Sequence, residues 1–343
     1  MMQLDITVLT NNVVIPFQKD VHLSDKCSFS VNKLFTTKSI AEHGLGFLIS
    51  LYKRSEESNS WDQEVLFKFI FDLGGDNLSF LHNLDVRGIP LYDIDVIALS
   101  HWHYDHIGGL YKVLERIERE VPIYTHPSAK SERFFKRSAE ITNESLKNKT
   151  REELLPYLKE SKIVNQAPIN LGKVNKLNGE VEFLEKKKKL FENEGIKILL
   201  SGEIPRIYEI EDFSNYYSLQ GELIKEDKIL DDKCLIIEFN DHIVLVNGCC
   251  HSGLMNTIDY VKKEISKKPI SHIIGGFHMA SASENRQKKT IKYLETFQNQ
   301  EQLCLFPIHC TGEEFIHQIL EKGSPHLLFY NISVGTTLSF ILG

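Results

Sequence analysis

Residues 95–110 read DVIALSHWHYDHIGGL, in which an apolar run expected to form a buried strand leads directly into three histidines and one aspartate. Alternate side chains of an extended segment point the same way, so His101 and His103 can bind one ion while Asp105 and His106 turn toward a second. The whole chain holds only 14 histidines in 343 residues, so three in this short window stand far above background. Nitrogen and oxygen ligands of this kind suit zinc, iron or manganese. The segment therefore predicts a metal site at the end of a buried strand.

Further histidines stand at strand ends in the C-terminal half of the chain. His251 follows the apolar run IVLVNGCC and His309 follows LCLFPI, so both are predicted metal ligands. His278 ends HIIGGFH in the same manner, where a metal ligand, a group that orients a ligand and a substrate contact are all open. Cys249 and Cys250 precede His251, but thiols in such a place are expected to be small core residues rather than nucleophiles.

The composition is that of a globular protein with a sizeable core. Hydrophobic residues make up 42% and charged residues 25% of the chain. With 40 Lys and Arg against 47 Asp and Glu, the net charge is −7, which argues against nucleic acid as a partner. No run of about 18 apolar residues is present to span a bilayer, and the first residues lack the layout of a signal peptide. We therefore expect a cytoplasmic protein without membrane contact, and its six cysteines, which form no CxxC pair, are expected to be reduced.

The chain is predicted to form a single domain over residues 1–343. The N-terminal part alternates apolar runs with turns, which is typical of strands in a buried sheet. Residues 127–196 are rich in Lys, Glu and Asn at helical spacing and predict a helical insertion. Within it, the run Lys186 to Lys189 lies among glutamates and is expected to be a solvated helix face rather than an anion site. Strand patterns return after Gly195.

The segment from His101 to His106 resembles the HxHxDH signature of the metallo-β-lactamase superfamily. The resemblance implies an α/β fold, a four-layer αββα sandwich with a dinuclear metal centre at one edge. By position, it assigns His101, His103 and His251 to a first ion and Asp105, His106 and His309 to a second. It also implies that Asp72, in FDLGG, orients the metal-binding loop. Most members carry a bridging Asp at the strand end where this chain has HIIGGFH, and here none is present.

Several short segments resemble one branch of that superfamily, which includes the archaeal dihydropterin–aminobenzene ribofuranosyl phosphate synthases and many uncharacterised hydrolase-like relatives. The segments are AEHGLGFLIS, FDLGG, SGEIPR, DDKCLIIEF, GCCHSGLMNT, IIGGFH and PIHCTG. In the synthase, the resemblance implies, an aryl amine displaces pyrophosphate from a pterin-methyl diphosphate. One fold hosts many chemistries, so the branch does not fix the substrate.

These observations give three hypotheses for function. The first is a hydrolase of a phosphate ester or similar small molecule, in which two divalent ions activate water. The ions expected are zinc, with manganese, iron or magnesium as alternatives. The second is the pterin-type transferase, and the third is a ligand-binding protein that has lost catalysis. Asp105 and His278 are the candidate catalytic residues, and His43, Arg206 and His278 are the candidate contacts to a phosphorylated small-molecule substrate.

Overall fold

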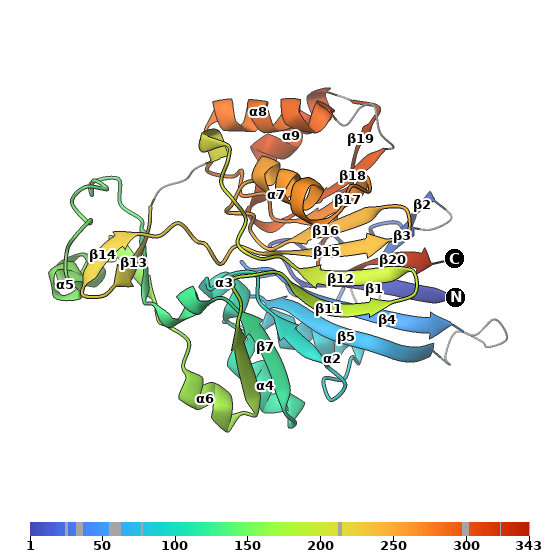
Figure 1. Ribbon diagram of the computed structural model, residues 1–343, viewed down its shortest axis with the longest axis horizontal. Helices are drawn as coiled ribbons and strands as arrows, with labels where there is room; N and C mark the ends of the chain where they lie inside the picture. The colour runs from blue at the N-terminus through green and yellow to red at the C-terminus, as the bar shows by residue number, and fades with distance from the viewer. Residues whose placement is uncertain are drawn as a thin grey trace.

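The computed structural model describes residues 1–24, 27–31, 37–54, 63–76, 78–211, 215–296, 302–322 and 324–342. Two large sheets pack face to face, and helices cover the outer face of each (Figure 1). The predicted α/β class and its αββα layering are confirmed.

The first sheet has nine strands, and both chain termini belong to it or adjoin it. Its order is β10 (Gly179–Phe183), β7 (Val121–Thr125), β6 (Val96–Ala98), β5 (Gln63–Leu73), β4 (Gly46–Arg54), β1 (Met2–Thr10), β20 (Thr336–Leu342), β3 (Cys27–Val31) and β2 (Val21–Ser24). Helices α2 (Ser79–Arg87), α4 (Leu110–Ile117) and α6 (Leu171–Lys176) lie below it in Figure 1, and the short helix α3 (Tyr104–Ile107) starts within the histidine-rich segment.

The second sheet has seven strands and carries the C-terminal histidines. Its order is β11 (Lys188–Asn193), β12 (Ile196–Leu200), β15 (Cys234–Phe239), β16 (Ile243–Asn247), β17 (Ile270–Gly275), β18 (Leu303–Pro307) and β19 (Leu327–Phe329). Its outer face is covered by α7 (Leu254–Tyr260), which continues as one π-helical segment (Val261–Ile265), and by α8 (Glu284–Glu295) and α9 (Glu313–Lys322). Short 3₁₀ turns lie at Pro127–Lys130, Glu209–Glu211 and His309–Thr311.

Three apolar clusters follow from this layering. Between the sheets, side chains such as Phe47, Phe71, Ile237 and Phe306 are completely buried. Separate clusters fill the space between each sheet and its helices. Strand β16 is buried on both faces, which explains why IVLVN reads as a continuous apolar run. Burial on both sides holds the strand ends, and the side chains that follow them, in fixed positions.

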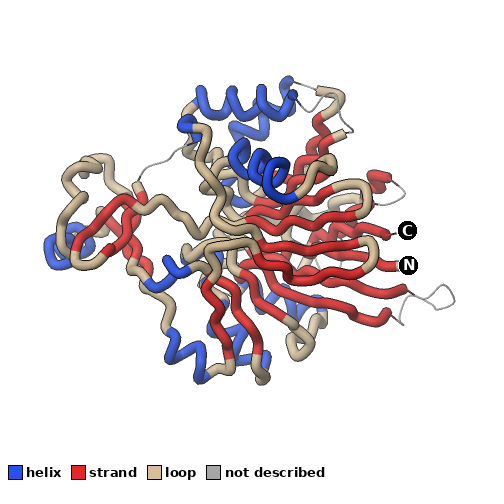
Figure 2. The backbone as a smooth tube through the Cα atoms, viewed as in Figure 1, coloured by secondary structure: helices blue, strands red, loops and turns tan. Residues whose placement is uncertain are grey.

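A third, smaller sheet stands apart from the sandwich. It consists of β14 (Leu223–Glu226), β13 (Tyr216–Gln220), β8 (Arg133–Lys136) and β9 (Ile163–Gln166). Together with α5 (Arg151–Lys159) it forms the lobe at the left of Figures 1 and 2, and we call it the inserted sheet. Its strands come from two separate parts of the chain, and they enclose an apolar cluster of their own.

The prediction of a helical insertion over residues 127–196 needs correction. Helices α5 and α6 are present, and α5 begins with a capping box in which Thr150 and Glu153 satisfy each other's backbone N–H groups. However, residues 181–195 form strand segments: β10 pairs with β7 and β11 pairs with β12. The high helix propensity of Lys and Glu is overridden because both strands complete the edges of large sheets. Charged side chains are common on such edges, and Lys188 and Lys189 pair there with nearby glutamates.

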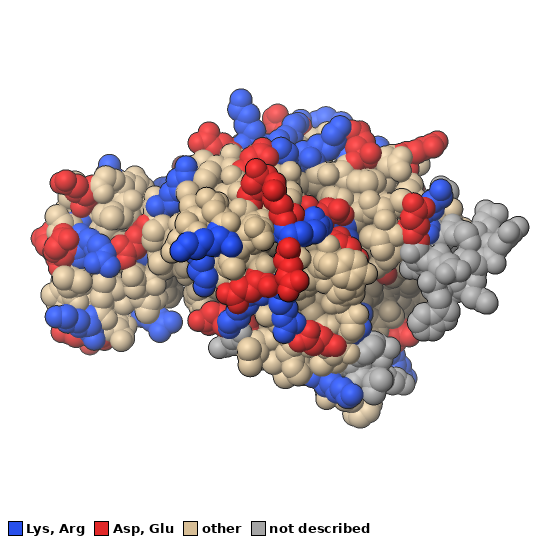
Figure 3. Space-filling model, turned by 90° about the horizontal axis from the view of Figure 1, so that it is seen from below, with Lys and Arg blue, Asp and Glu red and all other residues tan. Residues whose placement is uncertain are grey.

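One face of the molecule is mixed in charge. Lys and Arg are interspersed with Asp and Glu over the face seen in Figure 3. Among the described residues, no helix combines the length and the apolar character that crossing a bilayer requires.

Candidate metal centre

The predicted ligands meet at one end of the sandwich, on the side that faces the inserted sheet. His101 follows β6, His251 follows β16, His278 follows β17 and His309 follows β18. Because β16, β17 and β18 are parallel to one another, their carboxyl ends lie at the same edge of the sheet. The fold therefore brings together histidines that are more than 200 residues apart in sequence.

The first set consists of His101, His103 and His251. Their ring centroids are 4.4 Å apart for His101 and His103, 4.8 Å for His101 and His251, and 4.9 Å for His103 and His251. Burial, reinforced by the nearby Arg133 guanidinium, lowers the pKa of His103 to about 3. Burial, with the neighbouring imidazoles adding to it, also holds the pKa values of His101 and His251 well below the ordinary value. All three rings are therefore neutral at pH 7, the form in which imidazole binds metal.

The second set consists of Asp105, His106 and His309. Asp105 Oδ2 lies 3.3 Å from His309 Nε2 and 3.8 Å from His106 Nε2. Burial opposes ionisation of Asp105, but His106 and His309 outweigh it and hold the pKa of this carboxyl far below its usual range. Burial likewise opposes charge on His106, but Asp72 and Asp105 outweigh it and raise the pKa of His106 to about 9. Without a cation, a proton on His106 takes the place of the positive charge that this cluster favours.

Asp72 fixes the orientation of ligands in both sets. Its Oδ2 accepts hydrogen bonds from His106 Nδ1 and from Ser100 Oγ, each at 2.6 Å. Since Ser100 Oγ donates to Asp72, it accepts from His101 Nδ1 at 2.8 Å. Both imidazoles thus carry a proton on Nδ1 and direct Nε2 to the centre, where the charged His106 of the metal-free protein holds its second proton. A Cβ at Gly248 would clash with Ser100 Oγ, so glycine lets the loop after β16 reach this network. These contacts match the orienting role that the sequence resemblance implied for Asp72.

The buried nitrogen atoms give a test of whether a metal fits here. His101 Nε2 is buried and has no hydrogen-bond partner among the described residues. An unsatisfied buried nitrogen is costly unless a ligand takes up its lone pair. Asp105, His106, Cys249 and His309 bring their ligand atoms within 4.8 Å of one another, and so do His101, Cys249 and His251. These two groups fit divalent transition-metal ions, whereas His103, whose ring lies beside those of His101 and His251, is in none of the groups found among the described residues.

Two adjacent aspartates bind backbone N–H groups of the loops that carry the potential ligands. Asp231 Oδ2 accepts a hydrogen bond from the backbone N–H of Trp102, between His101 and His103, at 2.7 Å. Asp232 Oδ2 accepts one from the backbone N–H of Ser252, next to His251, also at 2.7 Å. The start of β15 thus ties together loops that belong to two different sheets.

The structure places Arg206 behind the site rather than in it. Its guanidinium donates to the carbonyl oxygen of His251 at 2.8 Å and to those of Lys228 and Ile229. Arg206 lines a separate cavity of about 240 Å³ together with residues such as Glu211 and Asn256. The expected substrate contact is therefore replaced by a bond that supports the His251 loop, because backbone carbonyls already engage the guanidinium.

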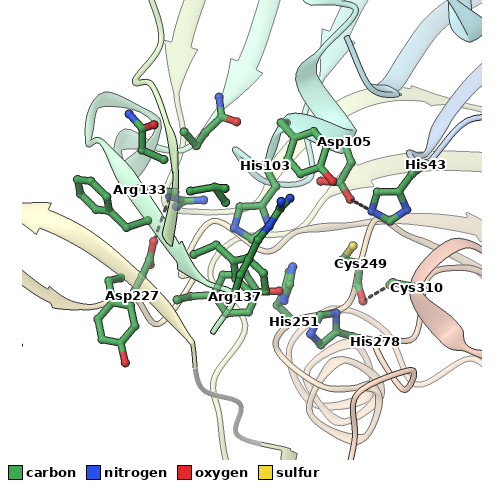
Figure 4. Close-up of a pocket in the computed structure, with 18 residues that line it drawn as sticks. His43, His103, Asp105, Arg133, Arg137, Asp227, Cys249, His251, His278 and Cys310 are labelled. Atoms are coloured by element: carbon green, nitrogen blue, oxygen red, sulfur yellow. Dashed lines mark hydrogen bonds and ion pairs between the residues drawn. The ribbon is translucent and has the colours of Figure 1, made fainter. Parts of the chain in front are cut away.

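A cavity of about 440 Å³ opens between the ligands and the inserted sheet (Figure 4). The ligand side contributes His103, Asp105, His251, His278, Cys249, Cys310, His43 and Tyr104. The inserted sheet and its neighbours contribute Arg133, Phe134, Phe135, Arg137, Val164, Asn165, Gln166, Tyr216, Tyr217 and Asp227. The cavity thus has one wall of potential metal ligands and an opposite wall rich in aromatic and amide side chains.

Both remaining substrate candidates line this cavity. His43 Nε2 lies 3.4 Å from Asp105 Oδ2, and its half-exposed ring stacks on that of His309 at 5.1 Å. His278 lies beside the first set, with its ring 4.2 Å from that of His251. His278 lines the cavity (Figure 4), and a metal ligand, a group that orients a ligand and a substrate contact all stay open for it.

Sequence reasoning missed three features of the wall. Arg133 is buried and forms ion pairs with Asp227 at 3.1 Å and Asp231 at 2.7 Å. Arg137 is exposed and extends toward His103 (Figure 4). Tyr216 stacks flat on His103, with ring centroids 5.1 Å apart and an interplanar angle of 12°. No motif marks these residues, since Arg133 and Tyr216 come from strands of the inserted sheet whose partners are distant in sequence, and Arg137 directly follows one of these strands.

Cys249 was also missed, because its local sequence is that of a small core residue. Its Sγ lies 3.0 Å from His106 Nε2, and among the described residues it belongs to all three of the ligand-atom groups that could hold an ion. The one local signal was its position two residues before His251.

The comparisons with known proteins agree with this geometry. The family model of the metallo-β-lactamase superfamily matches residues 60–193. A 7,8-dihydropterin-6-methyl-4-(β-D-ribofuranosyl)-aminobenzene-5'-phosphate synthase from Methanocaldococcus jannaschii is 30% identical over 285 residues, which cover 82% of this chain and 85% of that protein. The chain belongs to the metallo-β-lactamase superfamily. Proteins of this superfamily typically bind metal ions, and the clusters of histidine, aspartate and cysteine described above are where this member has suitable ligands.

Two other similarities extend this result. An uncharacterized protein of the same archaeon is 27% identical over 275 residues, covering 80% of this chain and 86% of that protein. The solved structure of Tm1679, described as a metal-dependent hydrolase of the β-lactamase superfamily, aligns with a TM-score of 0.66 at 18% identity. That alignment covers 97% of this chain and 98% of Tm1679, and it shows a shared fold.

Proposed function

We propose that this protein is a metal-dependent transferase that joins an aryl amine to a dihydropterin-methyl diphosphate and releases pyrophosphate. The observation that carries the proposal is the aromatic wall of the inserted sheet, which faces the potential metal ligands across one cavity. The synthase from M. jannaschii supports it, since the product in that protein's name joins a pterin and an aminobenzene, two planar aromatic groups, and carries a phosphate.

The centre would hold two divalent ions, one on His101, His103 and His251 and the other on Asp105, His106 and His309. When bound, the ions supply positive charge that favours departure of a diphosphate. Asp72 keeps the Nε2 atoms of His101 and His106 directed at them. Asp231 and Asp232 hold the two ligand loops in register with each other.

The aromatic wall suits a planar substrate. Tyr216 and Phe135 lie with their ring centroids 5.1 Å apart, and Tyr216 also stacks on His103. A planar ring placed against this wall gains stacking energy of roughly 0.5–1.5 kcal/mol per contact beyond its burial. Asn165 and Gln166 line the same wall and offer the donors and acceptors that heterocyclic nitrogen and oxygen atoms need.

Arg137 is the candidate for recognition of the phosphate groups. Its exposed side chain reaches over the cavity toward His103 (Figure 4). A guanidinium binds phosphate oxygens through paired hydrogen bonds, so this position would hold the diphosphate next to the metal ligands. In the proposed reaction a C–N bond forms at the pterin methylene group, the C–O bond to diphosphate breaks, and the amine nitrogen loses a proton to solvent.

Hydrolysis of a phosphate ester is the second candidate, and the position of Asp105 favours it. Its carboxylate oxygen lies within 3.8 Å of His43, His106 and His309, where it can orient a water molecule as well as bind an ion. Water would then take the place of the amine as the nucleophile.

Pyrophosphate release separates the two candidates. The purified protein is incubated with dihydropterin-methyl diphosphate, with and without the ribofuranosyl aminobenzene phosphate, and pyrophosphate is measured together with the coupled product. Release that requires the amine and matches product formation supports the transferase. Equal release without the amine supports hydrolysis. If no pyrophosphate is released with or without the amine, but the protein hydrolyses simple phosphate esters, the transferase proposal is overturned. His103→Ala is the inactive control for each arm.

A further inference from the structure

The space between the two ligand sets contains a sulfur atom where a carboxylate is expected. The sequence resemblance implied a bridging aspartate after β17, but that strand is followed by Gly276, Phe277 and His278. Two closely spaced cations repel each other, and an anionic group between them offsets this repulsion. A candidate for that group lies in the loop after β16.

Cys249 occupies this position. Its side chain is buried, and its Sγ lies 3.0 Å from Nε2 of His106, a ligand of the second set. The same sulfur lies within 4.8 Å of the ligand atoms of Asp105 and His309, and within 4.8 Å of those of His101 and His251. It is the residue that the two groups have in common among the described part of the chain. His101 Nε2, which has no hydrogen-bond partner there, belongs to one of these groups.

We propose that the Cys249 thiolate is a ligand shared by both metal ions and takes the place of the bridging carboxylate. On metal binding the S–H bond breaks, the proton leaves to solvent, and the sulfur binds each ion without any change of oxidation state. With Asp105, the thiolate gives the centre a second negative charge that balances the cations. The remaining ligands are neutral imidazoles.

The neighbouring cysteines do not occupy an equivalent position. Cys250 Sγ lies 3.5 Å from Thr257 Oγ1 and belongs to the apolar cluster between the second sheet and its helices. Cys310 groups with Cys249 and His278, and its Sγ donates to the carbonyl oxygen of Cys249 at 3.5 Å. Cys250→Ser is therefore the matched control, because it removes a buried thiol close to the centre. Cys310→Ser tests the alternative that the sulfur comes from the group of Cys249, His278 and Cys310.

A thiolate in this position has a consequence for the identity of the metal. Sulfur ligands select zinc, iron or cobalt, whereas magnesium and manganese favour sites made of oxygen. The shared thiolate thus narrows the ions named from the sequence to zinc or iron.

X-ray absorption at the zinc edge tests the proposal on the full-length protein loaded with zinc. Zinc bound to sulfur shows a shell at about 2.3 Å, distinct from nitrogen and oxygen at about 2.0 Å. We expect two zinc ions per chain and about one sulfur per zinc, because both ions see the same atom. A sulfur bound to only one of the two ions would give about half a sulfur per zinc. Cys250→Ser and Cys310→Ser should leave the shell unchanged.

Variants at Cys249 identify the source of the sulfur. Cys249→Ser should lose the sulfur shell and bind fewer ions, whereas Cys249→Asp should regain two ions with only nitrogen and oxygen shells. If Cys249→Ser does not fold, the Cys250→Ser/Cys310→Ser double variant must keep the full shell. The proposal is overturned by a wild-type spectrum without sulfur, by about half a sulfur per zinc, or by a shell that persists in Cys249→Ser or Cys249→Asp.

The measurement is made without substrate, so it is independent of the proposed reaction. A sulfur shell with no pyrophosphate release would refute the transferase and leave the shared thiolate standing.

Discussion

Nδ1 of His106 donates a hydrogen bond to Asp72 Oδ2 at 2.6 Å, and both side chains are completely buried. The same oxygen accepts from Ser100 Oγ, which in turn holds His101. One carboxylate therefore sets the proton position on one ligand from each set, directly for His106 and through a hydroxyl for His101. Such outer contacts fix ring orientation before any ion arrives.

Replacement of Asp72 by Asn should weaken metal binding roughly 10- to 100-fold. Asn is tolerated at the left-handed backbone angle of this residue, φ 59°, so the main chain should be preserved. Its amide, however, cannot accept from both Ser100 and His106 with the strength of a carboxylate. Competition titration with a chelator measures the change. Asp241→Asn, an exposed residue bonded to His242, is the control, and equal affinities in the two variants would contradict the assignment.

Metal binding should release protons in a way that depends on Asp72. The pKa of His106 is raised to about 9 without metal, mainly because Asp72 and Asp105 outweigh burial. The stability that this charged ring gives the metal-free protein is complete below the ordinary histidine pKa and is lost as pH rises through about 9. A metal must displace that proton, so affinity should fall as pH is lowered from about 9. Calorimetry in buffers of different ionisation enthalpy measures the release.

The Asp72→Asn variant provides the comparison for this release. Without the carboxylate charge the pKa of His106 falls, so fewer protons should be released at pH 7.5 than in the wild type. The same number released by both proteins would show that His106 is not the proton source.

Two arginines that line the same cavity should respond differently to replacement by alanine. Arg133 is buried between Asp227 and Asp231, so its loss leaves two buried carboxylates unpaired and should destabilise the fold by roughly 3–5 kcal/mol. Arg137 is exposed, and its loss should leave stability unchanged but raise KM for the phosphorylated substrate roughly tenfold. Urea unfolding and steady-state kinetics measure the two effects. A stability loss in Arg137→Ala, or an unchanged KM, would count against its role in phosphate recognition.

Tyr216 should contribute binding energy through its ring rather than its hydroxyl group. Tyr216→Ala removes the surface that stacks on His103 and faces the cavity, and should raise KM for the pterin substrate roughly fivefold. Tyr216→Phe keeps the ring and should behave like the wild type. An equal rise of KM in both variants would instead indicate that the hydroxyl group supplies the binding energy.

The resemblance of local motifs to a known family was sufficient to predict the fold, and the strand-end pattern of the sequence indicated the candidate ligands. The segment from His101 to His106 closely follows β6. His251 and His309 follow apolar strands whose ends are evident from the sequence. The carboxyl ends of parallel strands lie at the same edge of a sheet. Ligands that are far apart along the chain therefore come close together in the folded protein.

What could not be predicted depends on contacts between distant segments. Residues 181–195 have helix-forming side chains, yet 181–183 and 188–193 are strands because β7 and β12 offer edges for pairing. The sequence around Arg206 is typical of a residue that binds an anion. In the structure its guanidinium instead donates hydrogen bonds to backbone carbonyl groups of two other loops. The closeness of Cys249 to His106 joins residues 143 positions apart, and nothing in either neighbourhood indicates it.

The inserted sheet has an evolutionary consequence, because it encloses its own apolar cluster and presents side chains such as Tyr216 to the ligand wall. Mutations confined to these aromatic side chains leave the packing of the sandwich intact, whereas the buried ion pair of Arg133 with Asp231 must be kept. A descendant of this protein can therefore change the molecule it recognises while inheriting its metal centre unaltered. Because the sheet is assembled from two separate chain segments, 133–166 and 216–226, a hybrid with new recognition must exchange both together.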